Sequence, residues 1–78
     1  MPLYYFHVYN DDITLDDEGA ELADEHAALA RAIKEARVLA AETVRNGHLT
    51  PDHRIEIVDA DQNPVGTVRF GDAVEVRE

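Results

Sequence analysis

The sequence predicts a small α+β domain in which one amphipathic helix packs on one face of an antiparallel sheet. Residues 3–9 are dense in aromatic and β-branched side chains, and residues 54–59 alternate apolar and charged ones, as β-strands do. Between them, residues 24–46 repeat apolar side chains every three or four positions, which is the period of a helix. The 78 residues suffice for one hydrophobic core. We therefore expect residues 1–78 to form a single two-layer domain with the order ββαββ and a possible short final strand.

The first hairpin is predicted to join residues 3–9 to residues 13–16 through a turn at residues 10–12 (Asn-Asp-Asp). At strand period, one face of the first strand carries the side chains of Tyr4, Phe6 and Val8. The other face carries those of Tyr5, His7 and Tyr9. Residues 13–16 alternate apolar and polar side chains, and residues 17–19 (Asp-Glu-Gly) end the second strand.

The helix is predicted to begin after Asp24 as N-cap and to end at Asn46-Gly47, with Leu49 folding back over the last turn. We expect its apolar stripe to consist of Leu29, Ile33, Ala36, Ala40 and Val44, flanked by Ala32, Leu39 and Thr43. Its many alanines would let the helix backbone lie close to a sheet. Val38 falls in the middle of the polar face, where it is either a tolerated exposure or part of a contact.

The second hairpin is predicted at residues 54–59 and 65–70, with turn residues at 60–64. Ile55 and Ile57 point inward, and Val68 and Phe70 share a face of the following strand. Gly71-Asp72 then breaks the strand, so residues 73–76 form either a short edge strand or a tail. Antiparallel hairpins on both sides of one helix leave the opposite face of the sheet uncovered. Tyr5, His7 and Tyr9 point to that face, with Glu56 and Val58.

Charge is the strongest compositional feature, with a formal net charge of -10. Residues 1–30 contain no Lys or Arg, so the first part of the chain would repel nucleic-acid phosphates and anionic membranes and attract basic proteins. We expect no direct nucleic-acid or membrane binding. The apolar segment at residues 3–8 is too short for an export signal, and no run approaches the ~18 apolar residues of a membrane span, which predicts a cytoplasmic protein.

Catalytic, metal and cofactor sites find little support in the sequence. It contains no serine and no cysteine, and its four histidines lack the close spacing of a metal site. Two oxygen-rich stretches, residues 14–25 and 59–70, partly match calcium-binding loops, but the first begins with Thr14, and Pro64 replaces the glycine of the second. We interpret both as turns, and we expect neither a cofactor nor enzymatic activity. Without disulfides, so small a core favours a homodimer.

Several motifs together resemble a family of short uncharacterised bacterial proteins. They are the strand Tyr5-Phe6-His7-Val8, the turn Asp17-Glu18-Gly19-Ala20-Glu21-Leu22, an alanine-rich helix, Arg54-Ile55-Glu56-Ile57 and Phe70-Gly71-Asp72-Ala73-Val74. The resemblance covers nearly the whole chain. It implies a bacterial source and carries no assigned activity. The hairpin, acidic turn and helix are also similar to the antitoxin halves of some two-component toxin systems.

The leading hypothesis from the sequence is a non-enzymatic protein-interaction or regulatory module that acts through its open sheet face or a sheet edge. The candidate binding residues are Tyr5, His7, Tyr9, Asp16, Asp17 and Glu18. An alternative is an acidic decoy that occupies the nucleic-acid groove of another protein, motivated by the negative charge of residues 1–30. An antitoxin-like partner protein is a further alternative. A small-ligand carrier is disfavoured, because one helix on a short sheet leaves little volume for a pocket.

Overall fold

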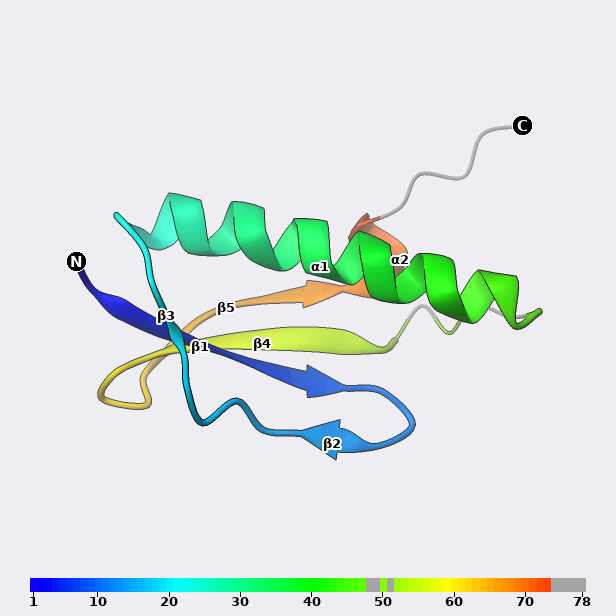
Figure 1. Ribbon diagram of the computed structural model, residues 1–78, viewed down its shortest axis with the longest axis horizontal. Coiled ribbons are helices and arrows are strands. Elements are labelled where there is room, and N and C mark those ends of the chain that lie inside the picture. The colour runs from blue at the N-terminus through cyan, green and yellow to red at the C-terminus, as the bar shows by residue number, and fades with distance from the viewer. Residues whose placement is uncertain (48–49, 51, 74–78) are drawn as a thin grey trace.

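The computed structural model describes residues 1–47, 50 and 52–73, and folds them into one sheet and one long helix (Figure 1). The elements in chain order are β1 (Leu3–Tyr9), β2 (Ile13–Thr14), β3 (Ala20–Glu21), α1 (Glu25–Arg45), β4 (Arg54–Asp59), β5 (Pro64–Arg69) and α2 (Phe70–Ala73). The sheet has the order β2-β1-β4-β5, with β3 also paired to β1, and every pair is antiparallel. The predicted α+β class, with one main helix on an antiparallel sheet, is confirmed.

The pairing of β1 with β4 forms the centre of the sheet, in register from Tyr4 opposite Asp59 to Tyr9 opposite Arg54. Alternation along both strands sorts their side chains as predicted. Toward α1, Tyr4, Phe6, Ile55 and Ile57 are buried. On the opposite face, which we call the outer face, the side chains are partly exposed; from β1 and β4 these are Tyr5, His7, Tyr9, Arg54, Glu56 and Val58.

The second predicted strand, residues 13–16, is wrong in its length. Only Ile13 and Thr14 pair with β1, after which the chain leaves the sheet and returns as the unpredicted strand β3. The cause is Asp16, whose carboxylate accepts a hydrogen bond from the backbone N–H of Phe6 at 3.1 Å, in the gap between the two short pairings. A short acidic side chain that captures backbone N–H groups competes with a regular strand ladder.

The ends of α1 agree with the sequence prediction. Asp24 is the N-cap, and its side chain accepts a hydrogen bond from the backbone N–H of Ala27 at 2.9 Å. Asn46 is the C-cap, and Gly47 follows with a φ of 101°, a left-handed conformation that favours glycine. Leu49, which was expected to fold back over the last turn, lies outside the described residues.

The predicted buried stripe of α1 is confirmed at Ala36 and Ala40 and wrong at Leu29 and Val44, because the helix is rotated toward its row of alanines. The four fully buried residues are Ala28, Ala32, Ala36 and Ala40, whereas Leu29 and Val44 are exposed. Alanine has no side chain beyond Cβ, so this row allows the helix backbone to approach the sheet closely. Larger side chains at the centre of the contact would hold the helix farther away, and they lie at its flanks instead.

The second hairpin forms as predicted, but its far end is helical. Asp59 accepts hydrogen bonds from the backbone N–H groups of Asp61 and Asn63, each at 2.9 Å, so this oxygen-rich stretch is a turn. Phe70 was predicted to lie in the last strand, yet it is fully buried in the short helix α2. Ala73, the start of the possible final strand, also belongs to α2, and the remainder of that segment, residues 74–76, lies outside the described residues.

The position of α1 over the sheet is off-centre. In Figure 1, α1 runs beside β5, and β1 and β2 lie farther from it. One flank of the helix is fixed on that side: the side chain of Leu29 lies close to Gly66 of β5, and the Arg37 Nε donates to the carbonyl of Ala73 in α2 at 2.8 Å. The other flank therefore borders open space next to β1.

Candidate functional site

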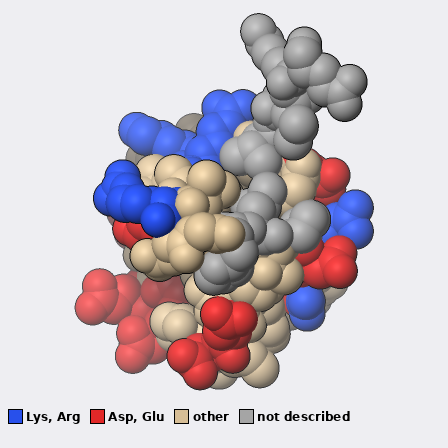
Figure 2. All heavy atoms as spheres, turned by 90° about the vertical axis from the view of Figure 1, so that its right-hand side faces the viewer, with Lys and Arg blue, Asp and Glu red and all other residues tan. Residues whose placement is uncertain are grey.

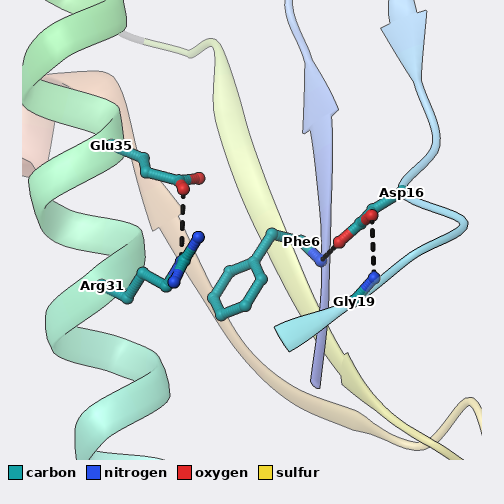
Figure 3. Close-up of polar contacts among 5 residues, drawn as sticks. All are labelled: Phe6, Asp16, Gly19, Arg31 and Glu35. Carbon is teal, nitrogen blue, oxygen red and sulfur yellow. Dashed lines mark hydrogen bonds and ion pairs between the residues drawn. The ribbon is translucent and has the colours of Figure 1, made fainter. Parts of the chain in front are cut away.

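The loop between β2 and β3 is held by one side chain (Figure 3). The Asp16 Oδ1 accepts hydrogen bonds from the backbone N–H groups of Glu18 and Gly19, and its Oδ2 accepts from Phe6 N–H, all at 3.1 Å. Gly19 has a φ of 73°, which favours glycine, and a Cβ there would lie 3.0 Å from the Tyr4 carbonyl oxygen. The acidic-glycine motif of the sequence is thus a turn that closes against the edge of β1.

These hydrogen bonds also set the protonation of Asp16. Partial burial of the carboxylate raises its pKa, but the hydrogen bonds from Gly19, Phe6 and Glu18, with the charge of His7, outweigh burial and hold the pKa below its ordinary value. Asp16 is therefore ionised near neutral pH and acts as a fixed acceptor for backbone N–H groups.

His7 connects this loop to the outer face of the sheet. Its Nδ1 accepts a hydrogen bond from the backbone N–H of Asp16 at 2.9 Å, so in the neutral ring the proton is on Nε2. Its ring stacks on Tyr5, with 6.5 Å between ring centroids and 16° between the planes. The His7 ring is hydrogen-bonded to the backbone of Asp16 and not to its carboxylate. The contact therefore fixes the orientation of the ring and does not form an acid–base pair.

Tyr9 stands at the other end of the same row of side chains. The guanidinium of Arg54 lies over its ring, 4.5 Å from the centroid, and the Nε of Arg54 is 2.8 Å from a carboxylate oxygen of Glu56. The contact between Tyr9 and Arg54 joins β1 to β4 across the outer face. Each aromatic side chain of this row is therefore held by a neighbour, which lowers the entropy that it would lose in a contact.

Among the predicted binding residues, the structure brings Tyr5, His7 and Asp16 together and leaves Tyr9 at the far end of the strand. Asp17 and Glu18 follow Asp16 in the turn, and their side chains are exposed. They border the outer face near Tyr5, since the adjoining Gly19 lies against that ring. Within the described residues, no three His, Cys, Asp or Glu side chains are grouped so that they could hold a metal ion.

A second surface, on the inner face, was missed by the sequence analysis. Two open hollows of about 370 and 570 Å³ lie between α1 and the β1 side of the sheet, and both are lined by Arg31 and Glu35. Phe6 and the loop at residues 14–20 border the first, and Val8, Val38 and Leu39 border the second. We call these two hollows the α1–β1 groove. The sequence analysis did not anticipate these open hollows, which form because α1 lies toward β5 and leaves part of the inner face beside β1 uncovered (Figure 1).

One signal in the sequence pointed to this groove. Val38 interrupts the polar face of the helix, and in the structure it is 55% exposed at the edge of the groove. Arg31 connects the helix side of the groove to the sheet side. Its Nε lies 3.4 Å from a carboxylate oxygen of Glu35 on α1, and its guanidinium is 5.8 Å from the centroid of the Phe6 ring on β1 (Figure 3).

Among the described residues, neither helix has the length and hydrophobicity that a membrane span requires.

Comparison with known families covers almost all of these elements. The family described as a domain of unknown function (DUF6894) matches residues 3–71. The chain belongs to the DUF6894 family. The match runs from β1 through the acidic turn and α1 into α2, so the predicted likeness to an uncharacterised family is confirmed, whereas a bacterial source stays a prediction. No curated protein and no solved structure matches the chain. The DUF6894 description assigns no activity, so function rests on the geometry of the two surfaces.

Proposed function

We propose that this DUF6894 domain is a non-enzymatic protein-binding module, and that the outer sheet face around Tyr5, His7 and Tyr9 is its contact surface. The observation that carries the proposal is the row of aromatic side chains fixed in place there. Tyr5 and His7 are stacked, and Tyr9 lies beneath Arg54. Tyrosine and arginine are, with tryptophan, the residue types most enriched among those that dominate binding energy in protein interfaces.

The charge around this face favours a partner that is basic around an apolar centre. Asp11 and Asp12 are exposed in the turn that follows Tyr9, and Asp17 and Glu18 are exposed on the side of Tyr5. Acidic side chains thus border both ends of the aromatic row. Complementary charge would speed association and orient the partner, while the buried aromatic contacts would supply most of the affinity.

The absence of enzymatic activity is supported by the chemistry of the sequence. It has no serine or cysteine to act as a nucleophile, and the ring of His7 is hydrogen-bonded to a backbone N–H. The carboxylate of Asp16 is occupied by three backbone N–H groups. The most buried polar groups of the candidate site are therefore engaged in holding the loop.

An affinity-capture experiment at two salt concentrations tests the proposal. The immobilised wild-type chain should retain a partner from a lysate of its source both at low salt and at about 0.5 M salt, where charge–charge attraction is strongly screened. The double variant Tyr5→Ala, Tyr9→Ala should lose it, whereas Val44→Glu, on an exposed flank of α1 away from both surfaces, should retain it.

Two outcomes would contradict the proposal. Retention by the aromatic double variant would exclude the outer face as the contact surface. Capture that high salt abolishes, and that Asp11→Asn, Asp12→Asn removes while Tyr5→Ala, Tyr9→Ala does not, would favour the acidic-decoy alternative. Circular dichroism of each variant should show the wild-type helix content, so that a lost contact is not confused with a lost fold.

A further inference from the structure

The α1–β1 groove is a part of the inner sheet face that the chain does not fill by itself. A two-layer domain buries the apolar face of its sheet under helices, and α1 does this beside β5. Next to β1, Val8 and Leu39 are only partly buried, and Val38 is 55% exposed. Apolar side chains thus line part of the floor of the groove, at Val8, and part of its α1 wall, at Val38 and Leu39.

The two walls of this groove have opposite charge. From α1 it is lined by two cations, Arg31 and Lys34, and by Glu35, which pairs with Arg31, so one positive charge is left over. From the loop between β2 and β3 it is lined by Asp16, Asp17 and Glu18. The same contrast extends over the molecule, because residues 1–30 contain no Lys or Arg, whereas α1 from residue 31 carries Arg31, Lys34, Arg37 and Arg45 against two glutamates. Figure 2 shows it from one end: on the left of the view, basic side chains gather above, on the side of α1, and acidic ones below, on the side of the β1–β2 hairpin, whereas the right flank carries both signs.

The solvent-facing side of α1 has the properties that an occupant of this groove would need. At helical spacing it presents Ala30, Lys34, Ala41 and Arg45, all exposed. The alanines would allow close approach to the floor at Val8, and the cations would face the acidic loop. A helix with small and basic side chains is therefore complementary to the groove in both shape and charge, and this chain contains one.

We propose that the groove binds α1 of a second copy of this chain. The two copies would form a two-fold symmetric dimer in which the two α1 helices lie side by side between the two sheets. Such a contact is self-complementary, because each chain supplies both a groove and the helix that fills one. A single two-fold rotation places α1 of each copy in the groove of the other. It also places the second helix where each sheet lacks one.

The dimer is independent of the protein-binding role proposed for the outer face. In this arrangement the outer faces of the two sheets point away from each other, so both stay accessible. The assembly would then present two copies of the Tyr5, His7 and Tyr9 surface, and could hold two partner molecules at once. The groove and the outer face lie on opposite sides of the sheet and share only the loop at residues 16–18. Variants at Val38, or at Tyr5 and Tyr9, therefore change one surface and leave the other intact.

A matched pair of substitutions on α1 tests the dimer. Val38 and Val44 are 55% and 58% exposed, but Val38 lines the groove and Val44 lies toward the opposite flank of the helix. We expect sedimentation equilibrium of the wild-type chain to give a dimer at micromolar concentrations. Val38→Glu should raise the dimer dissociation constant at least about tenfold, because a charge would be buried in the contact, and Val44→Glu should change it less than about threefold.

Three results would overturn the proposal. The first is a wild-type chain that stays monomeric at high micromolar concentration, which would leave the groove to a different protein. The second is a dimer that Val38→Glu does not weaken. The third is a dimer that Val44→Glu or Tyr9→Ala weakens as strongly as Val38→Glu does, because the contact would then lie elsewhere. Circular dichroism of Val38→Glu should match the wild type, since Lys34 lies one helical turn before it and offers an ion pair.

Discussion

The two halves of the inner sheet face differ in how completely they are covered. Beside β5, the row of alanines on α1 lies against the sheet, and Ile55, Ile57 and Phe70 are fully buried. Beside β1, the same helix leaves Val8 half-buried and Val38 exposed at the edge of an open groove. Tyr4 and Phe6 show that the core still reaches β1. The difference teaches that one helix completes the core over β4 and β5 and leaves part of the inner face beside β1 as a surface.

The largest difference in stability between the two halves should appear when a buried and a half-buried residue that face each other across β1 and β4 are each replaced by alanine. Ile55 and Val8 are direct neighbours in the β1–β4 register and point to the same face, but Ile55 is 0% exposed. Ile55→Ala should lower the free energy of unfolding by about 2–5 kcal/mol, because it opens a cavity in a filled core. Val8→Ala should cost only about 1 kcal/mol. Urea denaturation of dilute samples measures both, and equal losses would mean that the two halves are packed alike.

The close approach of α1 gives the next contrast, on the helix itself. Ala36→Leu inserts a large side chain where the helix meets the sheet, and should destabilise the fold by about 1–3 kcal/mol. Ala41→Leu, at an exposed position of the same helix, should stay within about 0.5 kcal/mol of the wild type when the chain is dilute enough to be monomeric, so that the proposed dimer contact at Ala41 does not contribute. If Ala36→Leu were tolerated as well as Ala41→Leu, the row of alanines would not be what sets the distance between helix and sheet.

Sequence periodicity predicted the fold class, both faces of β1 and β4, and the caps of α1, because each depends on residues close together in the chain. The direction in which α1 faces the sheet could not be predicted in this way. Leu29 and Val44 are more hydrophobic than alanine, yet the alanines occupy the centre of the helix–sheet contact. The stabilisation comes from close packing over the whole contact area and not from the burial of one large side chain. The groove beside β1 follows from that same choice.

At the candidate site, the sequence predicted the residues but not their roles. The aromatic row of β1 and the acidic turn both stood out as patterns. That Asp16 would reach across to Phe6 N–H and place its own N–H against His7 depends on a return of the chain to the sheet at β3. Two paired residues leave almost no periodic signal, so β3 and the contacts that depend on it were not predictable.

Asp16, in the loop that closes against the edge of β1, offers a test with a smaller expected effect. Asp16→Asn replaces the carboxylate that accepts three backbone hydrogen bonds by a neutral amide with one acceptor oxygen. The substitution should lower the free energy of unfolding by about 1–2 kcal/mol at neutral pH. Asp17→Asn, next to it and exposed, should change it by less than about 0.5 kcal/mol. Equal effects of the two substitutions would show that the loop is not held by the Asp16 carboxylate.

The smallest expected effect is the pH dependence that Asp16 contributes. Its pKa is lowered in the folded chain, so its stabilising contribution is complete above the ordinary carboxyl pKa of about 4 and is lost as the pH falls through the folded value below that. Stability measured by denaturation between about pH 5 and pH 2 should therefore fall less steeply for Asp16→Asn than for the wild type. Parallel curves would contradict the lowered pKa.

The central claim is that the uncovered half of the inner sheet face is completed by α1 of a second copy. A half-filtered NOE experiment on an equal mixture of isotope-labelled and unlabelled chains tests it most directly, since only contacts between copies give signals. Cross-peaks between protons of Ala30, Lys34 or Val38 in one copy and the methyl groups of Val8 in the other are the predicted result. Cross-peaks between copies that involve only Tyr5, His7 or Tyr9 would contradict it, as would none at all at high concentration.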